Sequence, residues 1–531
     1  MRRWNGWGYE RVEYHVRDNM LNLLKKLVGD SEYSYTAPME KVLKNVKKSR
    51  LNITHSLISV DEKDRLLYSR GQSLPDWIEL RFGEVMTFPD GVARPRNEQE
   101  VQELINFANR ENLCLIPYGG GTSVLGHINP MEVDKPVVTI SLERMDRLIG
   151  INEQNRVAEF YGGIIGPQIE RSLLPMGYRL GHYPQSYEFS SLGGWVATKS
   201  SGQQSFGYGR IDNMFVGGIL NTPKGVLEIP HIPGSAAGPD IKQLVLGSEG
   251  RIGILSRVKV KISPIPEKEL FEGYFLPSWE EGYKAVKTLS QENYPLSLLR
   301  LSNPKETLAH LTLAGGHVLV SALKKYLNLR KIGENGCLMV VGYSGSGKFV
   351  NRTRREVASL IKRKFKGVST YTLIGKAWQK NRFKAPYLRN SLWEMGYAVD
   401  TLETSVPWDR VTPTMNDIER SLEEALKSEG EKVYAFSHLS HFYVTGPSIY
   451  TTYIYRIAKD YDTTLNRWKK LKKAASEAII RNRGTISHHH GVGIDHKEYL
   501  EHEKGKIGIA VLKDMIKSFD PKGIMNPGKL V

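Results

Sequence analysis

Three adjacent histidines, His488, His489 and His490, stand inside the chain and are followed at once by Gly491 and Gly493. Imidazole changes its protonation state near neutral pH, so imidazoles grouped on a glycine-rich turn are suited to proton transfer during catalysis. A histidine-rich surface turn or a metal-binding tract would give the same run of residues. The choice between these interpretations depends on the rest of the chain.

Glycine-rich loops occur at three places where one expected element ends and another begins. The first, residues 117–123, reads PYGGGTS and follows the buried apolar segment 113–117. Consecutive glycines let backbone N–H groups approach a diphosphate closely, and Thr and Ser hydroxyls add further donors. The other two loops span residues 190–198 and 247–253. Each loop alone could be an ordinary turn, but together they predict one large ligand with a diphosphate and a planar ring.

The composition limits the class of protein. A chain of 531 residues is expected to form two or three domains. Its two cysteines, Cys114 and Cys337, exclude a disulfide framework and fit a reducing cytosol. We see no secretory signal, and no apolar stretch approaches the roughly 18–20 residues of a membrane-spanning helix. We therefore expect a cytoplasmic protein that makes at most peripheral contact with a membrane.

The net charge of +17 favours anionic partners. One basic segment, residues 467–473, carries Trp468 and predicts an amphipathic helix. Its basic face is either plain solvated surface or a contact with anionic phospholipid. Phosphorylated substrates are a second class of anionic partner. Nucleic acid is not expected, because the chain has no zinc-finger spacing and no RNA-recognition signature.

The hydrophobic patterns divide the chain into four parts. Residues 1–80 are mostly helix and loop, and residues 81–265 alternate short strands and helices with glycine turns. Residues 266–485 mix strands and helices, and residues 486–531 contain a final helix at 506–518. In the third part the expected strands are 269–275, 296–301, 337–343, 433–445 and 448–456, and the expected helices are 279–291, 304–312, 350–365, 387–399, 412–428 and 462–481. The apolar face of the final helix comprises Ile507, Val511, Leu512, Met515 and Ile516.

Several motifs resemble those of flavoproteins of the vanillyl-alcohol oxidase type, which share a PCMH-type FAD-binding domain. The loop 117–123, the stretch 189–195 and residues 247–250 carry this resemblance. Within the superfamily the chain most resembles the alkyldihydroxyacetonephosphate synthase (alkylglycerone-phosphate synthase) family, nearly from end to end. The narrower motifs are WNGWGY at 4–9, ETSVPWDR at 403–410 and SHHHGVG at 487–493.

The resemblance implies an α+β fold with a two-subdomain PCMH-type FAD-binding domain and an α/β cap domain that has an antiparallel sheet. It implies that FAD is bound non-covalently, because no histidine follows Gly121 at the position where some relatives attach the ring. The implied activity exchanges the acyl chain of an acyl-dihydroxyacetone phosphate for a fatty alcohol. That exchange would proceed through a flavin N5 adduct without net redox. A homodimer is expected, and no metal is.

The same resemblance assigns roles to individual residues. Tyr450 matches the catalytic tyrosine, and its phenol, with an ordinary pKa of about 10, would need a cationic neighbour to ionise easily. A half-buried structural tyrosine and a surface arginine are the alternative interpretations of Tyr450 and Arg389. The histidine motif of the family is matched by His488, His489 and His490. The residues implied in substrate binding are Arg389 for the phosphate, Arg300, and His441 in place of a family arginine. The residues implied in FAD binding are Pro117, Tyr118, Gly119, Gly120, Gly121, Thr122, Ser123, Ser186, Ser190, Ser191, Gly193, Gly194, Trp195, Thr198, Gly247, Ser248, Glu249, Gly250 and Gly253.

Two features depart from that family. The stretch 436–441, FSHLSH, lacks the arginine that eukaryotic members carry before the catalytic strand. The tail 520–529 is more like that of flavin-dependent 2-hydroxy-acid dehydrogenases or oxidases, which are the alternative function. Those enzymes usually carry Gly-Glu-His-Gly-x-Gly where this chain has residues 488–493, together with an H-x-G-D-G-N-x-H stretch that is missing here. Both differences favour the synthase.

Overall fold

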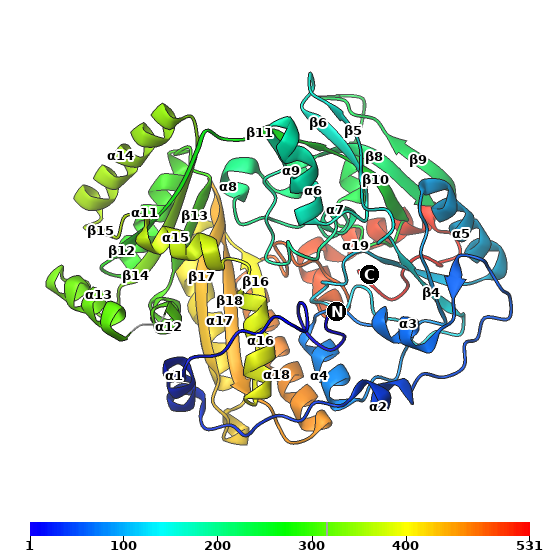
Figure 1. Ribbon diagram of the computed structural model, residues 1–531, viewed down its shortest axis with the longest axis horizontal. Coiled ribbons are helices and arrows are strands. Elements are labelled where there is room, and N and C mark those ends of the chain that lie inside the picture. Colours follow the sequence, from blue (N-terminus) through cyan, green and yellow to red (C-terminus); the bar gives the residue numbers. More distant parts are fainter. Residues whose placement is uncertain (315–316) are drawn as a thin grey trace.

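The computed structural model describes residues 1–314 and 317–531, and Figure 1 shows how its elements are arranged. One half of the molecule contains a four-stranded and a five-stranded sheet, and the other contains a seven-stranded sheet with helices packed against it. The C-terminal segment returns to lie between the two halves (Figure 1). The α+β fold predicted from the sequence, including an antiparallel sheet in the second half, is confirmed.

The four-stranded sheet has the order β1 (Ile58–Ser59), β2 (Gly91–Ala93), β4 (Val137–Ser141), β3 (Cys114–Tyr118). Strands β2 and β3 both run parallel to β4, a pairing that requires crossover connections. The helix α5 (Glu98–Glu111) begins after Asn97, whose side chain accepts the amide of Glu100, and its apolar face packs against the sheet. Because β3 ends at Tyr118, the loop 119–123 lies at the carboxyl end of a parallel strand, where ligands commonly bind.

The five-stranded sheet is antiparallel, in the order β5 (Leu148–Asn152), β6 (Val157–Tyr161), β10 (Ile254–Lys261), β8 (Phe215–Thr222), β9 (Gly225–Ile229). The second glycine loop leads into α7 (Leu192–Thr198), where the hydroxyl of Ser191 accepts the amide of Gly194 as the cap. Nearby elements are α6 (Gly166–Leu173), α8 (Ser205–Tyr208), α9 (Ile211–Met214), α10 (Lys242–Val245) and the pair β7 (Tyr178–Arg179) and β11 (Ser263–Pro264).

The seven-stranded sheet has the order β15 (Val368–Ser369), β12 (Lys268–Leu276), β14 (Cys337–Gly345), β13 (Leu298–Ser302), β17 (Tyr434–Tyr443), β18 (Gly446–Arg456), β16 (Tyr397–Ser405). All five strands expected from the sequence between 269 and 456 are present in it. The register of β18 places Tyr450 beside His438 of β17 on one side and Glu403 of β16 on the other. Three neighbouring strands therefore deliver polar side chains to one place.

The helices of this half are α11 (Trp279–Gln291), α12 (Pro304–Ala314), α13 (His317–Leu329), α14 (Gly347–Lys364), α15 (Thr372–Asn381), α16 (Ala385–Glu394), α17 (Val411–Glu424) and α18 (Tyr461–Arg481). Those of the N-terminal segment are α1 (Asp18–Val28), α2 (Met39–Leu43), α3 (Glu62–Leu67) and α4 (Leu74–Phe82). The C-terminal segment contains α19 (Leu500–Phe519). The boundary expected at residue 80 falls inside α4, whose Trp77 and Ile78 lie in the core.

The helix expected at 387–399 is too long, and the strand β16 was not expected. The helix ends at Glu394, and Gly396 follows with φ +80°, a left-handed conformation that terminates helices. A side chain at this position would also overlap the carbonyl of Glu32. Both the left-handed backbone and the lack of space therefore require glycine. The residues after Gly396 then pair with β18.

Residues 467–473 lie in α18 as the predicted amphipathic helix, and Lys469, Lys470 and Lys473 are exposed on its basic face. Trp468 lies on the buried side and donates its indole N–H to Asp400 Oδ2 at 2.9 Å. Arg467 pairs with Glu429 and Glu431 at 2.9 Å each. On α19, Ile507 and Val511 are 82% and 60% exposed rather than buried on the predicted apolar face. Among the described residues, no helix has both the length and the apolar character needed to cross a bilayer.

Both chain ends pack close to the glycine loops. The amide of Asn526 donates to the carbonyl of Leu115 in β3, and Met525 bridges to the same residue. At the other end, the ring of Trp7 packs edge-on against Phe189 at 5.4 Å between centroids. The amide of Asn390 in α16 donates to the carbonyl of Trp7. The two ends therefore tie both halves of the molecule to the loop region.

Candidate active site

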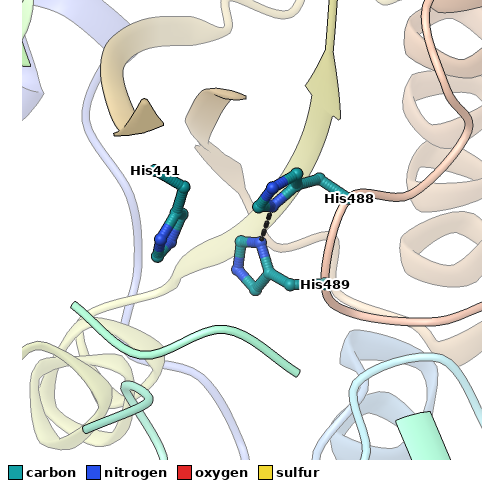
Figure 2. Close-up of side chains that lie close together, drawn as sticks. All are labelled: His441, His488 and His489. Carbon is teal, nitrogen blue, oxygen red and sulfur yellow. Dashed lines mark hydrogen bonds between the residues drawn. The ribbon is translucent and has the colours of Figure 1, made fainter. Parts of the chain in front are cut away.

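Figure 2 shows that His441, from β17, faces His488 and His489, from the loop between α18 and α19. The ring centroid of His441 lies 5.2 Å from that of His488 and 5.0 Å from that of His489. The Nδ1 atoms of His488 and His489 are 2.9 Å apart. The ring of His490 follows at 4.6 Å from that of His489. The structure thus brings together four histidines that the sequence places in two separate segments.

His441 sits on an irregularity of its strand. The register between β17 and β18 shifts between Ser440 and Phe442, and His441 adopts φ +49°, a conformation that is uncommon for a residue with a side chain. Its Nδ1 then meets the hydroxyls of Ser201 at 3.0 Å and Ser205 at 2.8 Å. Because of this bulge, the imidazole of His441 points toward the histidine triplet. It does not follow the alternating side-chain directions of an ordinary strand.

Tyr450 lies between two imidazole rings. Its phenol is stacked against His438 at 5.0 Å and against His489 at 6.0 Å between centroids. Burial raises the pKa of Tyr450 to about 12, and the charges of Glu403 and Asp400 also raise it, whereas Arg389 acts in the opposite direction. The cationic neighbour anticipated from the sequence is present, but it does not outweigh burial. The phenol is therefore a proton donor at neutral pH.

Burial lowers the pKa values of His441, His488 and His489 well below the ordinary imidazole value, and their mutual repulsion and Arg210 lower them further. These rings are neutral at pH 7. The guanidinium of Arg210 donates to Tyr443 Oη and to His488 Nε2, both at 3.3 Å. Because a guanidinium only donates, Nε2 is the acceptor and the proton of His488 is assigned to Nδ1, where it meets His489.

Tyr443 and Arg210 were not predicted from the sequence. Tyr443 Oη lies 2.6 Å from His488 Nε2, so it fixes the orientation of that ring together with Arg210. Neither residue stands in a motif, since Arg210 comes from the start of α9 and Tyr443 from the end of β17. No sequence signal pointed to either residue, because the bulge at His441 interrupts the alternation of β17 just before Tyr443.

The two arginines expected to bind substrate have different environments. Arg389 stacks over Trp77 at 4.4 Å and donates from Nη1 to the carbonyl of Gln72 at 3.0 Å. Its Nη2 is buried without a partner in the described part of the chain, which leaves donors for an anion. Arg300, in contrast, already donates to Glu306 Oε1 at 2.9 Å and lies 3.1 Å from His438 Nδ1.

The cluster containing Arg300 supports the tyrosine. His438 Nδ1, at the edge of the ring, lies 2.9 Å from Glu306 Oε1, and a face of the same ring stacks on Tyr450. Burial lowers the pKa of His438 to about 4, so this ring is neutral and its Nδ1–H donates to Glu306. Arg300 therefore acts on Tyr450 through Glu306 and His438, and Glu306 was not predicted from the sequence.

The three glycine loops pack against one another. A side chain at Gly119 would overlap Ser191, one at Gly120 would overlap the carbonyl of Phe189, and one at Gly250 would press on Pro117. In the third loop the amide of Glu249 donates to the carbonyl of Ala197 on α7. The loops predicted to share one ligand thus form one continuous wall.

The first loop has the donor set that a diphosphate needs. Across the described residues, the backbone N–H groups of 119–123 find no protein acceptor, and Gly121 has φ +66°. Such a run of free amides on a turn forms an anion-binding concavity. The hydroxyl of Ser123 is held by His127, with Oγ 2.6 Å from Nδ1. The residues present therefore fit a dinucleotide diphosphate.

Other side chains in the predicted cofactor set are used inside the protein. Trp195 donates its indole N–H to Ser190 Oγ at 2.7 Å, and Thr198 donates to the carbonyl of Gly194 at 2.9 Å. Both contacts stabilise α7 and occupy the polar atoms of these two side chains. The carboxylate of Glu249 accepts the amides of Val492 and Gly493 at 2.6 and 2.9 Å. Glu249 thereby ties the third glycine loop to the histidine loop.

This fold and these free amides define a class of protein: a flavoprotein with a two-sheet FAD-binding half and a sheet-and-helix cap that carries the reactive side chains. The model of the family "FAD binding domain" matches residues 89–229, and that of "FAD linked oxidases, C-terminal domain" matches residues 265–530. FAD as the cofactor, predicted from the sequence, is confirmed by these matches.

Similar proteins identify the family within this class of flavoproteins. The chain is 31% identical to the alkyldihydroxyacetonephosphate synthase of Dictyostelium discoideum, with 89% of this chain and 78% of that protein covered. It is 30% identical to the enzyme of that name from Trypanosoma brucei brucei, with 100% and 92% covered. A solved structure of alkyldihydroxyacetonephosphate synthase matches with a TM-score of 0.85 at 26% identity, covering 99% of this chain and 98% of that one. The chain belongs to the alkyldihydroxyacetonephosphate synthase family.

Proposed function

We propose that this protein exchanges the acyl chain of an acyl-dihydroxyacetone phosphate for a fatty alcohol and so forms an ether lipid precursor. The single observation that carries the proposal is the convergence of Tyr450 and the histidine triplet on one site, next to an arginine with unused donors. The relatives named as alkyldihydroxyacetonephosphate synthases, which match over most of the chain, support the same activity.

The reaction needs proton movement but no external oxidant. The bond between C1 and the acyl oxygen breaks, the bond between C1 and the alcohol oxygen forms, and the fatty acid leaves with its bonding electrons. The alcohol loses a proton, so the site must hold one basic and one acidic group. When bound in its reduced form, the flavin would supply a nucleophilic ring nitrogen, N5, for this exchange.

The residues of the chain divide these tasks. Arg389 binds the phosphate of the substrate through its free guanidinium donors. A neutral imidazole of the triplet takes the proton of the alcohol, because burial keeps these rings unprotonated at neutral pH. Tyr450 stays protonated, with a pKa of about 12, and donates a hydrogen bond to an oxygen of the substrate. His441 takes part in substrate binding from the opposite wall, where Ser201 and Ser205 hold it.

Further proposals follow from a lipid-like substrate. We place the protein in the cytoplasm, with peripheral contact to a membrane from which the fatty alcohol is drawn, and we propose a homodimer. Ile507 and Val511 of α19, one turn apart and both exposed, support a lipid contact. Co-sedimentation with phospholipid vesicles tests the contact: we expect the Ile507→Ser, Val511→Ser double variant to sediment less than the wild type. Light scattering of the same preparation tests the dimer.

Substrate turnover separates the proposed function from the alternative. The FAD-loaded protein, incubated with a long-chain acyl-dihydroxyacetone phosphate and a labelled fatty alcohol, should give a labelled ether product without any electron acceptor. A 2-hydroxy-acid dehydrogenase would instead reduce its flavin with D-lactate or glycolate. Bleaching of the flavin by either hydroxy acid, with no ether formed, would reject the synthase proposal.

A further inference from the structure

A buried carboxylate lies directly behind the histidine triplet. Glu403 is 1% exposed and stands on β16, in register with Tyr450 of β18. Its Oε2 accepts the amide of His488 at 2.5 Å. Its Oε1 accepts the amides of His489 and His490 at 3.1 and 2.8 Å. One side chain therefore holds the backbone of all three histidines.

The remaining amides of the loop are held in a related way. Ser487 donates its hydroxyl to Glu403 at 2.8 Å, and its oxygen accepts the amide of Gly491 at 2.9 Å. The amides of Val492 and Gly493 go to the second buried carboxylate, Glu249. Every N–H from 488 to 493 thus ends on one of two carboxylates or on Ser487, and the loop is fixed at both ends.

The two carboxylates differ in what else they face. Glu403 lies 3.6 Å from the Nδ1 atoms of both His489 and His490, whereas Glu249 faces His127 at 3.2 Å and not the triplet. In His489, Nδ1 is already occupied by His488. In His490, Nδ1 has Glu403 as its polar neighbour. A carboxylate on one side of an imidazole favours the tautomer with its proton on that side and stabilises the imidazolium.

We propose that Glu403 is the positioning residue that makes His490 the general base of the triplet. It holds the loop through three amides, and its negative charge keeps the proton of neutral His490 on Nδ1. The opposite nitrogen, Nε2, is then the basic one, and the imidazolium formed when it accepts a proton is stabilised by the same carboxylate. His490 would act as the base in the proposed exchange reaction, so this inference rests on the proposed function.

The charges around His490 explain why Glu403 has a large influence on the pKa of His490. The other titratable or charged groups that face it are Lys472, Asp400, His127, His488, His489, His496 and Tyr450. Burial lowers the pKa of His490, and Glu403 is the largest influence in the raising direction. Burial alone raises the pKa of Glu403, but His490 and the loop amides bring it below its usual value, so the carboxylate is ionised at neutral pH.

The test compares Glu403→Gln with Glu249→Gln in the FAD-loaded protein. Histidine titration is followed by NMR with labelled imidazoles, which requires no substrate. In Glu403→Gln the pKa of His490 should fall by about one to three pH units, because an opposite charge within contact distance is lost. Glu249→Gln should leave that titration unchanged while lowering the melting temperature or the retention of FAD.

Turnover adds a second readout. In Glu403→Gln the acid limb of the pH profile should move down by the same interval, and kcat at neutral pH should fall by roughly 10²-fold or more. In a His490→Gln background the same substitution should have little further effect, because its target is already gone. An unshifted His490 titration would overturn the inference even if kcat fell. A shifted titration in a protein that makes no ether would instead reject the proposed function.

Glu403→Asp covers the case in which the glutamine variant does not fold. Aspartate keeps the charge but is shorter, so the loop amides are held less well. The His490 titration should stay close to that of the wild type, with a lower melting temperature. A downward shift in Glu403→Asp as large as that expected from loss of the charge would overturn the inference.

Discussion

The phenol of Tyr450 lies nearly parallel to the imidazole of His438, with 5.0 Å between ring centroids and 24° between planes. The two residues are direct partners in the register of β18 and β17. Cross-strand partners are held at short range by the sheet itself, so the tyrosine is aimed by backbone pairing before any substrate arrives. Glu306 accepts hydrogen bonds from His438 Nδ1 and from Arg300, and this holds the His438 ring in place behind Tyr450.

Removal of the Tyr450 hydroxyl should abolish most of the activity and leave the fold intact. In Tyr450→Phe we expect kcat to fall by roughly 10²–10⁴-fold, because a positioned acid or base contributes about that much. Bound FAD, measured by its release on denaturation, should equal that of the wild type, since the ring still stacks between two imidazoles. Tyr371→Phe is a matched control, because Tyr371 is 67% exposed. Loss of FAD from the Tyr450 variant would assign this residue a structural role.

The pH profile should have its acid limb at low pH. Burial lowers the pKa values of the triplet, so the neutral imidazole that acts as the base persists below the usual imidazole range. Activity should be lost only as the pH falls through those lowered values. On the alkaline side Tyr450 ionises at about 12, so no loss from this group is expected up to about pH 10. Measurement of kcat/KM across this pH range tests both limbs of the profile. An acid limb above the ordinary imidazole pKa would contradict the prediction.

Arg389 should determine affinity for the phosphorylated substrate. In Arg389→Lys we expect KM to rise at least about tenfold, because lysine keeps the charge but not the planar pair of donors. Loss of the stacking on Trp77 adds to the effect. Arg352→Lys is the control, since the side chain of Arg352 is 81% exposed and makes one ion pair within its own helix. Initial-rate kinetics with varied acyl-dihydroxyacetone phosphate distinguish the two, and equal KM values would remove Arg389 from the phosphate site.

Gly120 should be indispensable for FAD binding. A methyl group there would overlap the carbonyl of Phe189, so Gly120→Ala must push apart the first and second loops. We expect a purified protein without flavin colour that cannot be reconstituted with FAD. In the same half of the molecule, Gly150→Ala places its methyl in open space and should keep its FAD. Retention of FAD by the Gly120 variant would show that the free amides of 119–123 do not form the cofactor wall.

The sequence predicted those parts of the fold that depend on local patterns. The five strands expected in the seven-stranded sheet were predicted correctly, because each is a short apolar or alternating run bounded by turn residues. The strand β16 was missed because its residues continue the pattern of α16, and the stop signal is a single glycine, Gly396, after the helix. The amphipathic helix around Trp468 was predicted, but the partner of its indole was not, because Asp400 belongs to the unexpected strand β16.

The chain by itself determined the chemistry available: the glycine loops, the tyrosine and the three consecutive histidines are local motifs, and their residue types limit what they can bind or transfer. Only the tertiary structure decided how they act. Three features join residues from separate segments of the chain. They are the bulge at His441, the hydrogen bond from Arg210 to His488, and the hydrogen bonds that Glu403 accepts from the histidine loop. Strand register and burial set those contacts and the resulting pKa shifts, and both arise only when distant parts of the chain pack together.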